Sequence, residues 1–281
     1  MIREQAPEGS GVDDIVDTQR YGLEDLESAA SGNLVAACRR SLAERGSFDL
    51  EGFLRPEALA AAVAETEPLM RAASFAHEQR HNIYFAAEVP GLPASHDALT
   101  PLETSNDTLT GDQLIGSVVD RVYNWGALCL FLAAVFDKPR LYRMADPLAR
   151  LNVMGYRGGQ GINWHFDRSQ FTVTLLLQAP EAGGVFEYRR NLRSETDPNY
   201  EGVARLLRGE DDRVEVLRVR PGTLNVFAGR YAAHRVTPSE GPRPRLVAIL
   251  SFMERPDVQF SAADRIQFYG RAEPVATPAR S

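Results

Sequence analysis

In the stretch Gly161-Ile162-Asn163-Trp164-His165-Phe166-Asp167-Arg168, a histidine and an aspartate stand two positions apart. Side chains alternate between the two faces of an extended backbone, so His165 and Asp167 are expected to point to the same side. A second histidine follows far downstream, in Tyr231-Ala232-Ala233-His234-Arg235-Val236-Thr237-Pro238. Together the three side chains would offer a metal ion two imidazole nitrogens and one carboxylate.

This donor set is typical of non-haem Fe(II) centres, in which two histidines and one carboxylate occupy one face of the metal. The alternative is a chance tripeptide beside an ordinary histidine, because short motifs often arise without function. The sequence context favours the metal site. We therefore expect His165, Asp167 and His234 to bind iron.

The context consists of strand-like segments, rich in apolar and β-branched residues and separated by glycine turns. These segments are Phe171–Leu177, Val185–Tyr188, Gly222–Phe227 and Arg245–Phe252. Both ligand segments then stand at strand ends in a many-stranded antiparallel pattern, where a barrel or jelly roll opens. The sequence predicts a mainly β fold with flanking helices.

Composition excludes several classes of protein. The chain has 281 residues, 44% of them hydrophobic and 25% charged, which fits one large β domain with added helices. A net charge of −7 argues against a nucleic-acid partner, because phosphate binding needs a concentrated basic surface. The chain has only 2 cysteines, which cannot build a disulfide framework, so we expect a cytoplasmic location.

We expect no membrane segment. No basic region precedes an apolar one at the amino terminus, so no secretory signal is apparent. The longest apolar run, residues 125–136, is shorter than the roughly 20 residues that span a bilayer. We interpret it as a buried core helix.

The expected organisation is a flexible tail over residues 1–30, one domain over 31–270 and a second tail over 271–281. Within the domain, 31–140 should be largely helical and about 141–255 should form the strand core. The loop over 189–212 is longer than a hairpin needs, which makes it a candidate lid.

A second motif points to a different chemistry. His77-Glu78-Gln79-Arg80-His81 matches His-Glu-x-x-His, which on a helix places two imidazoles on one zinc ion and makes this a metallopeptidase. The residues that follow, Asn82-Ile83-Tyr84-Phe85, have strand character, which argues against the helix. A zinc metallopeptidase through His77, Glu78 and His81 remains one alternative, and a non-catalytic small-molecule-binding barrel is another.

The chain resembles the Fe(II)/2-oxoglutarate-dependent dioxygenases, and in particular the branch of free-amino-acid halogenases with its hydroxylase and oxidative-cyclase relatives. The likeness runs from about Phe48 to Phe268. It rests on six phrases: Leu151-Asn152-Val153-Met154-Gly155-Tyr156, Trp164-His165-Phe166-Asp167-Arg168, Thr174-Leu175-Leu176-Leu177-Gln178, Phe186-Glu187-Tyr188, Asn191-Leu192-Arg193 and His234-Arg235-Val236-Thr237-Pro238. The resemblance implies a double-stranded β-helix core of the jelly-roll or cupin kind, and Fe(II), 2-oxoglutarate and O2 as cofactors.

The same resemblance implies an arginine for the far carboxylate of 2-oxoglutarate, because a guanidinium binds carboxylates in a bidentate fork. Arg245 opens the strand after His234, where this fold usually supplies that arginine. Arg243 is the competitor, but it lies between Pro242 and Pro244 in a turn. The hydroxyl of Thr237 is a candidate second contact.

The implied reaction is oxidation of a C–H bond in a free amino acid or related small molecule, with succinate and CO2 as co-products. Halogenating relatives carry a small residue where this chain has Asp167, so hydroxylation is expected and chlorination is not. Oxidative cyclisation or desaturation of an aliphatic amino acid is the alternative outcome. Candidate substrate contacts are Arg168, Ile162, His81 and Asn82, and a homodimer stays open.

Overall fold

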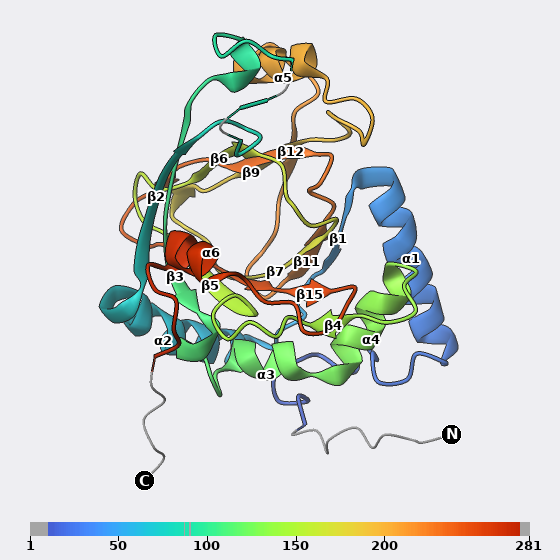
Figure 1. Ribbon diagram of the computed structural model, residues 1–281. Helices are drawn as coiled ribbons and strands as arrows, with labels where there is room; N and C mark the ends of the chain where they lie inside the picture. The colour runs from blue at the N-terminus through green and yellow to red at the C-terminus, as the bar shows by residue number, and fades with distance from the viewer. Residues whose placement is uncertain (1–10, 87, 90, 276–281) are drawn as a thin grey trace.

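The computed structural model describes residues 11–86, 88–89 and 91–275. Two antiparallel sheets face each other across the middle of the molecule (Figure 1). The larger, seven-stranded sheet has the order β1 (Ser47–Leu50), β11 (Leu224–Phe227), β7 (Thr172–Gln178), β14 (Arg245–Leu250), β5 (Leu151–Tyr156), β3 (Leu102–Thr110) and β2 (Phe75–His81). The four-stranded sheet has the order β10 (Glu215–Leu217), β9 (Phe186–Arg189), β12 (Ala233–Val236) and β6 (Ile162–His165).

Strand β7 shows how the sequence separates the inside of this jelly roll from the outside. Its residues alternate in direction, as a strand requires. Val173, Leu175 and Leu177 belong to the large apolar core. Thr172, Thr174 and Leu176 line the cavity between the sheets. The run is therefore apolar on one face and mixed on the other, because one side packs and the other surrounds a site.

Helices cover the outer face of the larger sheet; Figure 1 shows three of them along its lower side and α1 at the right, beside β1. They are α1 (Ala29–Arg45), α2 (Pro56–Ala73), α3 (Val118–Asn124) and α4 (Gly126–Val135). Gly46 ends α1 in the left-handed region at φ 74°, which glycine adopts without steric cost. The apolar run over 125–136 is the buried helix that the sequence predicts, with Phe131 packed edge-on against Phe48.

The prediction of a flexible tail over residues 1–30 is wrong for residues 11–30, the part that the structure describes. Val12, Ile15, Val16, Tyr21 and Leu23 are all buried in the same core as α4. Their irregular spacing has no helical or strand period, which is why the segment lacked a structural signal. Residues 1–10 lie outside the described part of the chain.

The candidate lid over 189–212 is also corrected. It contains α5 (Tyr200–Leu207), whose Val203 and Leu206 pack with Trp164 on the outer face of the four-stranded sheet. A buried ion pair between Arg189 Nε and Asp211 Oδ2, at 2.9 Å, ties its ends together. The segment is thus docked against the sheet, and its length is used for packing.

Among the described residues, no single helix is long and apolar enough to cross a membrane. Helices α3 and α4 reach the required length and composition only when taken together across a bend of 58°.

Asp146 anchors α6 (Ala262–Tyr269) to the loop before β5. It accepts hydrogen bonds from the backbone N–H of Leu148, Ala149 and Phe260 and from Arg265 Nε, at 2.8 to 2.9 Å. Burial alone would raise the pKa of Asp146, but these donors outweigh it and hold the pKa below its usual value. The folded state therefore favours the charged form.

We expect Asp146→Ala to lower the free energy of unfolding by about 3 to 5 kcal/mol, because it leaves the Arg265 guanidinium without its carboxylate. Urea unfolding at neutral pH would measure this. The contribution is full above the unfolded-state pKa of about 3.9 and is lost as pH falls through the lower folded-state pKa. The difference between variant and wild type should therefore shrink in acid. The exposed Asp212→Ala is the control, and equal stability of Asp146→Ala and wild type would contradict the prediction.

Candidate metal centre

His165, Asp167 and His234 converge at the end of the four-stranded sheet. His165 closes β6 and pairs directly with His234 of β12 across the sheet. Asp167 Oδ1 lies 3.7 Å from His165 Nε2 and 3.4 Å from His234 Nε2. One ligand atom from each residue lies within 4.8 Å of the others, and this is the only such cluster in the described ranges. The three groups are close enough to share one cation.

Neighbouring groups orient each ligand. His165 Nδ1 lies 2.8 Å from the carbonyl of Asn163, and His234 Nδ1 lies 3.0 Å from that of Ala232. A carbonyl only accepts, so each Nδ1 carries the proton and each Nε2 presents its lone pair to the centre. The Thr172 hydroxyl donates to Asp167 Oδ2 at 2.6 Å, which fixes the carboxylate.

Gly229 backs the carboxylate from the other side. Its carbonyl accepts from the N–H of Asp167 at 3.1 Å. A Cβ built on Gly229 would stand 2.0 Å from Asp167 Oδ2, well inside van der Waals contact. Only glycine therefore fits at this position while Asp167 keeps its present place.

The electrostatics suit a cation. Burial, with the neighbouring His234, lowers the pKa of His165 to about 3, so this imidazole is neutral. Burial alone would raise the pKa of Asp167, but His234 and His165 hold it far below its usual value. Burial likewise acts to lower the pKa of His234, whereas the Asp167 charge outweighs it and raises that pKa. The Asp167 charge thus favours a positive charge beside His234, which a divalent metal would supply.

A cavity of about 400 Å³ extends from these ligands into the barrel. Strand register gives its direction. Thr172, which bonds Asp167, starts β7, whereas Gln178 at the other end of β7 pairs with Leu246, the neighbour of Arg245. The metal centre and Arg245 therefore occupy opposite ends of one cavity, with apolar walls that include Leu176 and Val247.

Arg245 is a buried cation without an anion. Its side chain forms no ion pair within the described part of the chain, and its Nη1 has no hydrogen-bond partner there. Burial lowers the pKa of Arg245, and no carboxylate compensates. Burying an unpaired charge is unfavourable, so the arrangement fits an anionic ligand. A dicarboxylate could pair one carboxylate with Arg245 while its other end reaches the metal ligands.

Two hydroxyls near Arg245 were not predicted from the sequence. Tyr156 is the cross-strand partner of Arg245 and lies under its guanidinium at 5.9 Å. Among the described residues, its hydroxyl bonds only to Met154 Sδ, at 3.7 Å. Ser239 Oγ is buried and has no hydrogen-bond partner in the part of the chain that the structure describes. A Cβ built on Gly184 would lie 3.2 Å from Ser239 Oγ and 3.3 Å from Arg245 Cδ, so the serine and the arginine converge there. Strand register was needed to find both.

Thr237, predicted to bind the same carboxylate, faces the other way. Its hydroxyl accepts from the N–H of Val185 at 2.9 Å, and it lines a separate outer groove. His234 and Val236 point into the cavity, and alternation then directs Thr237 outward. The Thr237 hydroxyl is therefore used by a backbone N–H outside this cavity.

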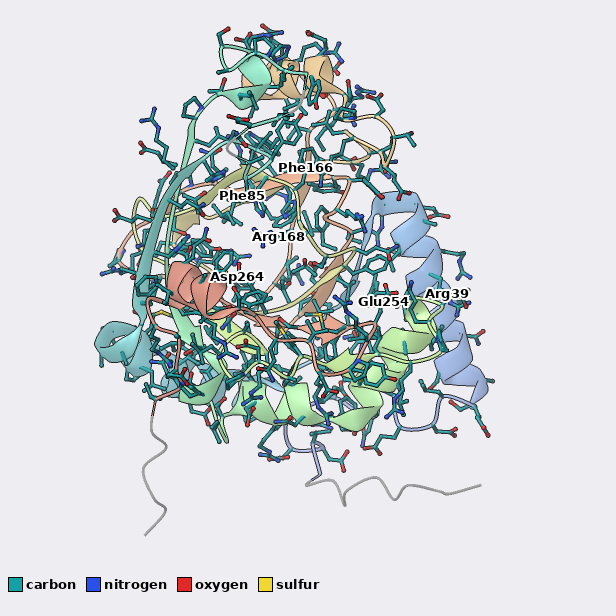
Figure 2. All side chains as sticks on the ribbon, viewed as in Figure 1. Arg39, Phe85, Phe166, Arg168, Glu254 and Asp264 are labelled. Atoms are coloured by element: carbon teal, nitrogen blue, oxygen red, sulfur yellow. The ribbon has the colours of Figure 1, made fainter. Side chains whose placement is uncertain are left out.

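Of the four predicted substrate contacts, one lines the cavity and three do not. Ile162 lines the cavity. Arg168 is exposed at the metal end, 5.9 Å from the ring of Phe268 on α6. Figure 2 groups Arg168, Phe85 and Phe166 in the middle of the view, above Asp264 of α6.

His81 and Asn82 do not line this cavity. His81 is bonded to Thr104 and stacks on Phe85 at 4.2 Å, and the Phe85 ring in turn meets His165 edge-on. The Asn82 side chain bonds Tyr84 and Ala86 in its own loop. The Asn82 amide thus shapes that turn, and a substrate contact for Asn82 stays a prediction.

The zinc-peptidase alternative is also contradicted. His77 to His81 forms the end of strand β2 and contains no helical turn. Four residues of strand separate the two imidazoles by about 13 Å, too far to share an ion. His77 instead packs between Phe75 and Phe268.

Comparisons with known proteins agree with this geometry. A family model described as Halogenase D matches residues 30–267. No curated protein matches the chain. A prolyl hydroxylase from Trichoplax adhaerens, in complex with a hypoxia-inducible-factor peptide fragment, superposes with a TM-score of 0.53 at 14% identity, over 83% of this chain and 93% of that one.

Two further solved structures are similar. AviO1 from Streptomyces viridochromogenes Tue57 gives a TM-score of 0.53 at 15% identity, covering 79% of this chain and 96% of that one. The non-heme alpha-ketoglutarate-dependent epimerase SnoN from nogalamycin biosynthesis gives 0.53 at 14% identity, covering 79% and 84%. At these identities the likeness establishes the fold, and it confirms the predicted double-stranded β-helix core.

Proposed function

This chain belongs to the Halogenase D family of 2-oxoglutarate-dependent dioxygenases, and on that premise we propose that it hydroxylates an unactivated C–H bond of a free amino acid or a similar small molecule. It is an oxidoreductase with Fe(II), 2-oxoglutarate and O2 as cofactors. In the proposal, His165, Asp167 and His234 hold the iron, and Arg245 binds the far carboxylate of 2-oxoglutarate. Bound together, iron, 2-oxoglutarate and O2 supply the oxidation of a C–H bond and yield succinate and CO2.

One observation carries the proposal: a three-residue metal face and an unpaired buried arginine stand at opposite ends of one cavity. A dicarboxylate fixed at the arginine is held in line with the metal face. The apolar walls, among them Leu176 and Val247, exclude water around it. The protein therefore contributes position and desolvation, and no side chain is required as an acid or a base.

Asp167 decides between oxygenation and halogenation. Its carboxylate occupies the ligand position that a halide would need, and Thr172 and Gly229 hold it there. We therefore expect the wild-type enzyme to form no chlorinated product when chloride is supplied in excess. Mass spectrometry of the product mixture would measure this, with the chloride-free reaction as control. A chlorinated product would contradict the role given to Asp167.

The direct test is substrate-stimulated succinate release. The purified protein with Fe(II), ascorbate and 2-oxoglutarate would be screened against the free amino acids. A gain of one oxygen atom in the product indicates hydroxylation, and a loss of hydrogen alone indicates the second candidate, cyclisation or desaturation. A protein that releases no succinate with any compound would be a non-catalytic binding barrel.

Cellular location is a further part of the proposal. Cys38 is buried and Cys129 half-buried, and both are free thiols. Thiols that persist unpaired suit a reducing compartment, so we place the enzyme in the cytoplasm.

A further inference from the structure

Arg193 packs on the ring of Phe166, a residue of the buried cluster that also contains Trp164. Its guanidinium carbon is 3.9 Å from the centroid of the Phe166 ring, and Phe166 stands between His165 and Asp167 in the chain. Tyr84 stacks on the same ring with centroids 5.9 Å apart. This half-buried cation is therefore held flat by aromatic packing.

The hydrogen bonds of Arg193 leave its outer end free. Its Nε donates to the carbonyl of Arg230 at 2.9 Å, and its two terminal nitrogens bond to no residue in the described ranges. Neither Arg193 nor Arg230 joins an ion pair with any described residue. Glu88 and Glu195 line the same cleft, but neither is within pairing distance of them.

The cleft containing these groups has a volume of about 430 Å³, and Tyr84 and Tyr231 contribute to its walls. Arg230 follows Gly229, the residue that backs the Asp167 carboxylate. The terminal nitrogens of Arg193, without a partner among the described residues, thus share a cleft with Arg230, which follows the glycine that contacts Asp167. Burial is the main reason that the pKa of Arg193 lies below its usual range, and Arg230 lowers it further.

The main cavity runs from the metal ligands to Arg245 and is taken by 2-oxoglutarate in the proposed function. This leaves the cleft for the molecule that is oxidised. In the proposed function, 2-oxoglutarate fills the barrel between the metal face and Arg245, so the molecule to be oxidised must approach from the metal end. Arg168 also stands at that end, but its guanidinium is exposed and rests over Phe268. Arg193 differs because it is half-buried and oriented by Phe166 and Arg230, while its terminal nitrogens have no acceptor among the described residues.

We propose that the terminal nitrogens of Arg193, with Arg230 beside them, bind the carboxylate of the substrate, so the enzyme selects small molecules with a free carboxylate. This inference rests on the proposed function and specifies its substrate class. A guanidinium can take a carboxylate through two parallel hydrogen bonds, which orients the ligand as well as holding it. The rest of the substrate would then extend from this cleft toward Asp167, whose backbone N–H donates to Gly229 beside Arg230.

Isothermal titration calorimetry under anaerobic conditions would test this, with protein loaded with Fe(II) and 2-oxoglutarate. The probes are the free amino acids and their primary amides, which keep the ammonium group and lose the carboxylate charge. We expect at least one amino acid to bind about ten to a hundred times more tightly than its amide. Arg193→Gln should abolish this preference, and Arg193→Lys should retain part of it.

Arg205→Gln is the matched control, because Arg205 is an exposed arginine on the same segment, in α5. It should keep the full preference, and thermal unfolding of each variant would confirm that it is folded. The proposal is overturned if no amino acid binds, if the preference survives in Arg193→Gln, or if Arg168→Gln removes it instead. Failure of the oxygenase function is a separate result: the wild type would then release no succinate even with compounds that bind.

Discussion

Asp167→Ala is expected to reduce succinate release at least about a hundredfold, because it removes a metal ligand, and losing even an outer partner of a ligand costs ten- to a hundredfold. The variant keeps both histidines but offers the metal only two protein donors. Its iron content after reconstitution should fall in parallel. Metal analysis and the 2-oxoglutarate turnover assay would measure the two effects independently.

Asp212→Ala is the control for this experiment, since Asp212 is exposed and distant in sequence from all three ligands. It should retain full turnover and iron content. An Asp167→Ala enzyme that holds iron normally and keeps most of its turnover would remove Asp167 from the metal site. The His165→Ala variant should then be tested for the same behaviour.

Arg245→Leu is expected to raise the KM for 2-oxoglutarate by about ten- to a hundredfold, because a charge-assisted pair with the far carboxylate is lost. Thermal unfolding gives a second test of Arg245 that does not depend on catalysis. Adding 2-oxoglutarate with a divalent metal should raise the unfolding temperature of the wild type and leave that of the variant nearly unchanged. Without 2-oxoglutarate the variant should be no less stable than the wild type, since it loses an unpaired buried charge.

Arg243→Leu is the matched comparison, because Arg243 lies two positions earlier, in the exposed turn, with a contact only to the Pro180 carbonyl. Its KM for 2-oxoglutarate should equal that of the wild type. If Arg243→Leu raised the KM and Arg245→Leu did not, the two arginines would have to exchange roles.

The sequence predicted those parts of the site that follow from local alternation. His165 ends β6 and Asp167 follows two positions later with its ligand atom near that of His165, as alternation predicts, and Arg245 was identified as the first residue of a strand. The same rule would have excluded Thr237, which has the opposite parity to His234. That error came from weighting residue type above position.

Other features depend on register or on packing at a distance, which one sequence does not contain. Tyr156 meets Arg245 only because β5 pairs with β14 in this register. His77-Glu78-Gln79-Arg80-His81 has the letters of a helical motif, but its pairing with β3 makes it a strand. Val12 and Leu23 show no periodicity, and their burial results from the surface that α4 and its neighbours present.

The close approach of Gly229 to Asp167 links two positions that lie far apart along the chain. An acidic residue at 167 permits nothing larger than hydrogen at the α-carbon of 229. Loss of the carboxylate would remove the atoms that a side chain at 229 would meet and leave space beside the two histidines. The residue at 229 is therefore coupled to the ligand at 167. A redesign of either position has to take the other into account.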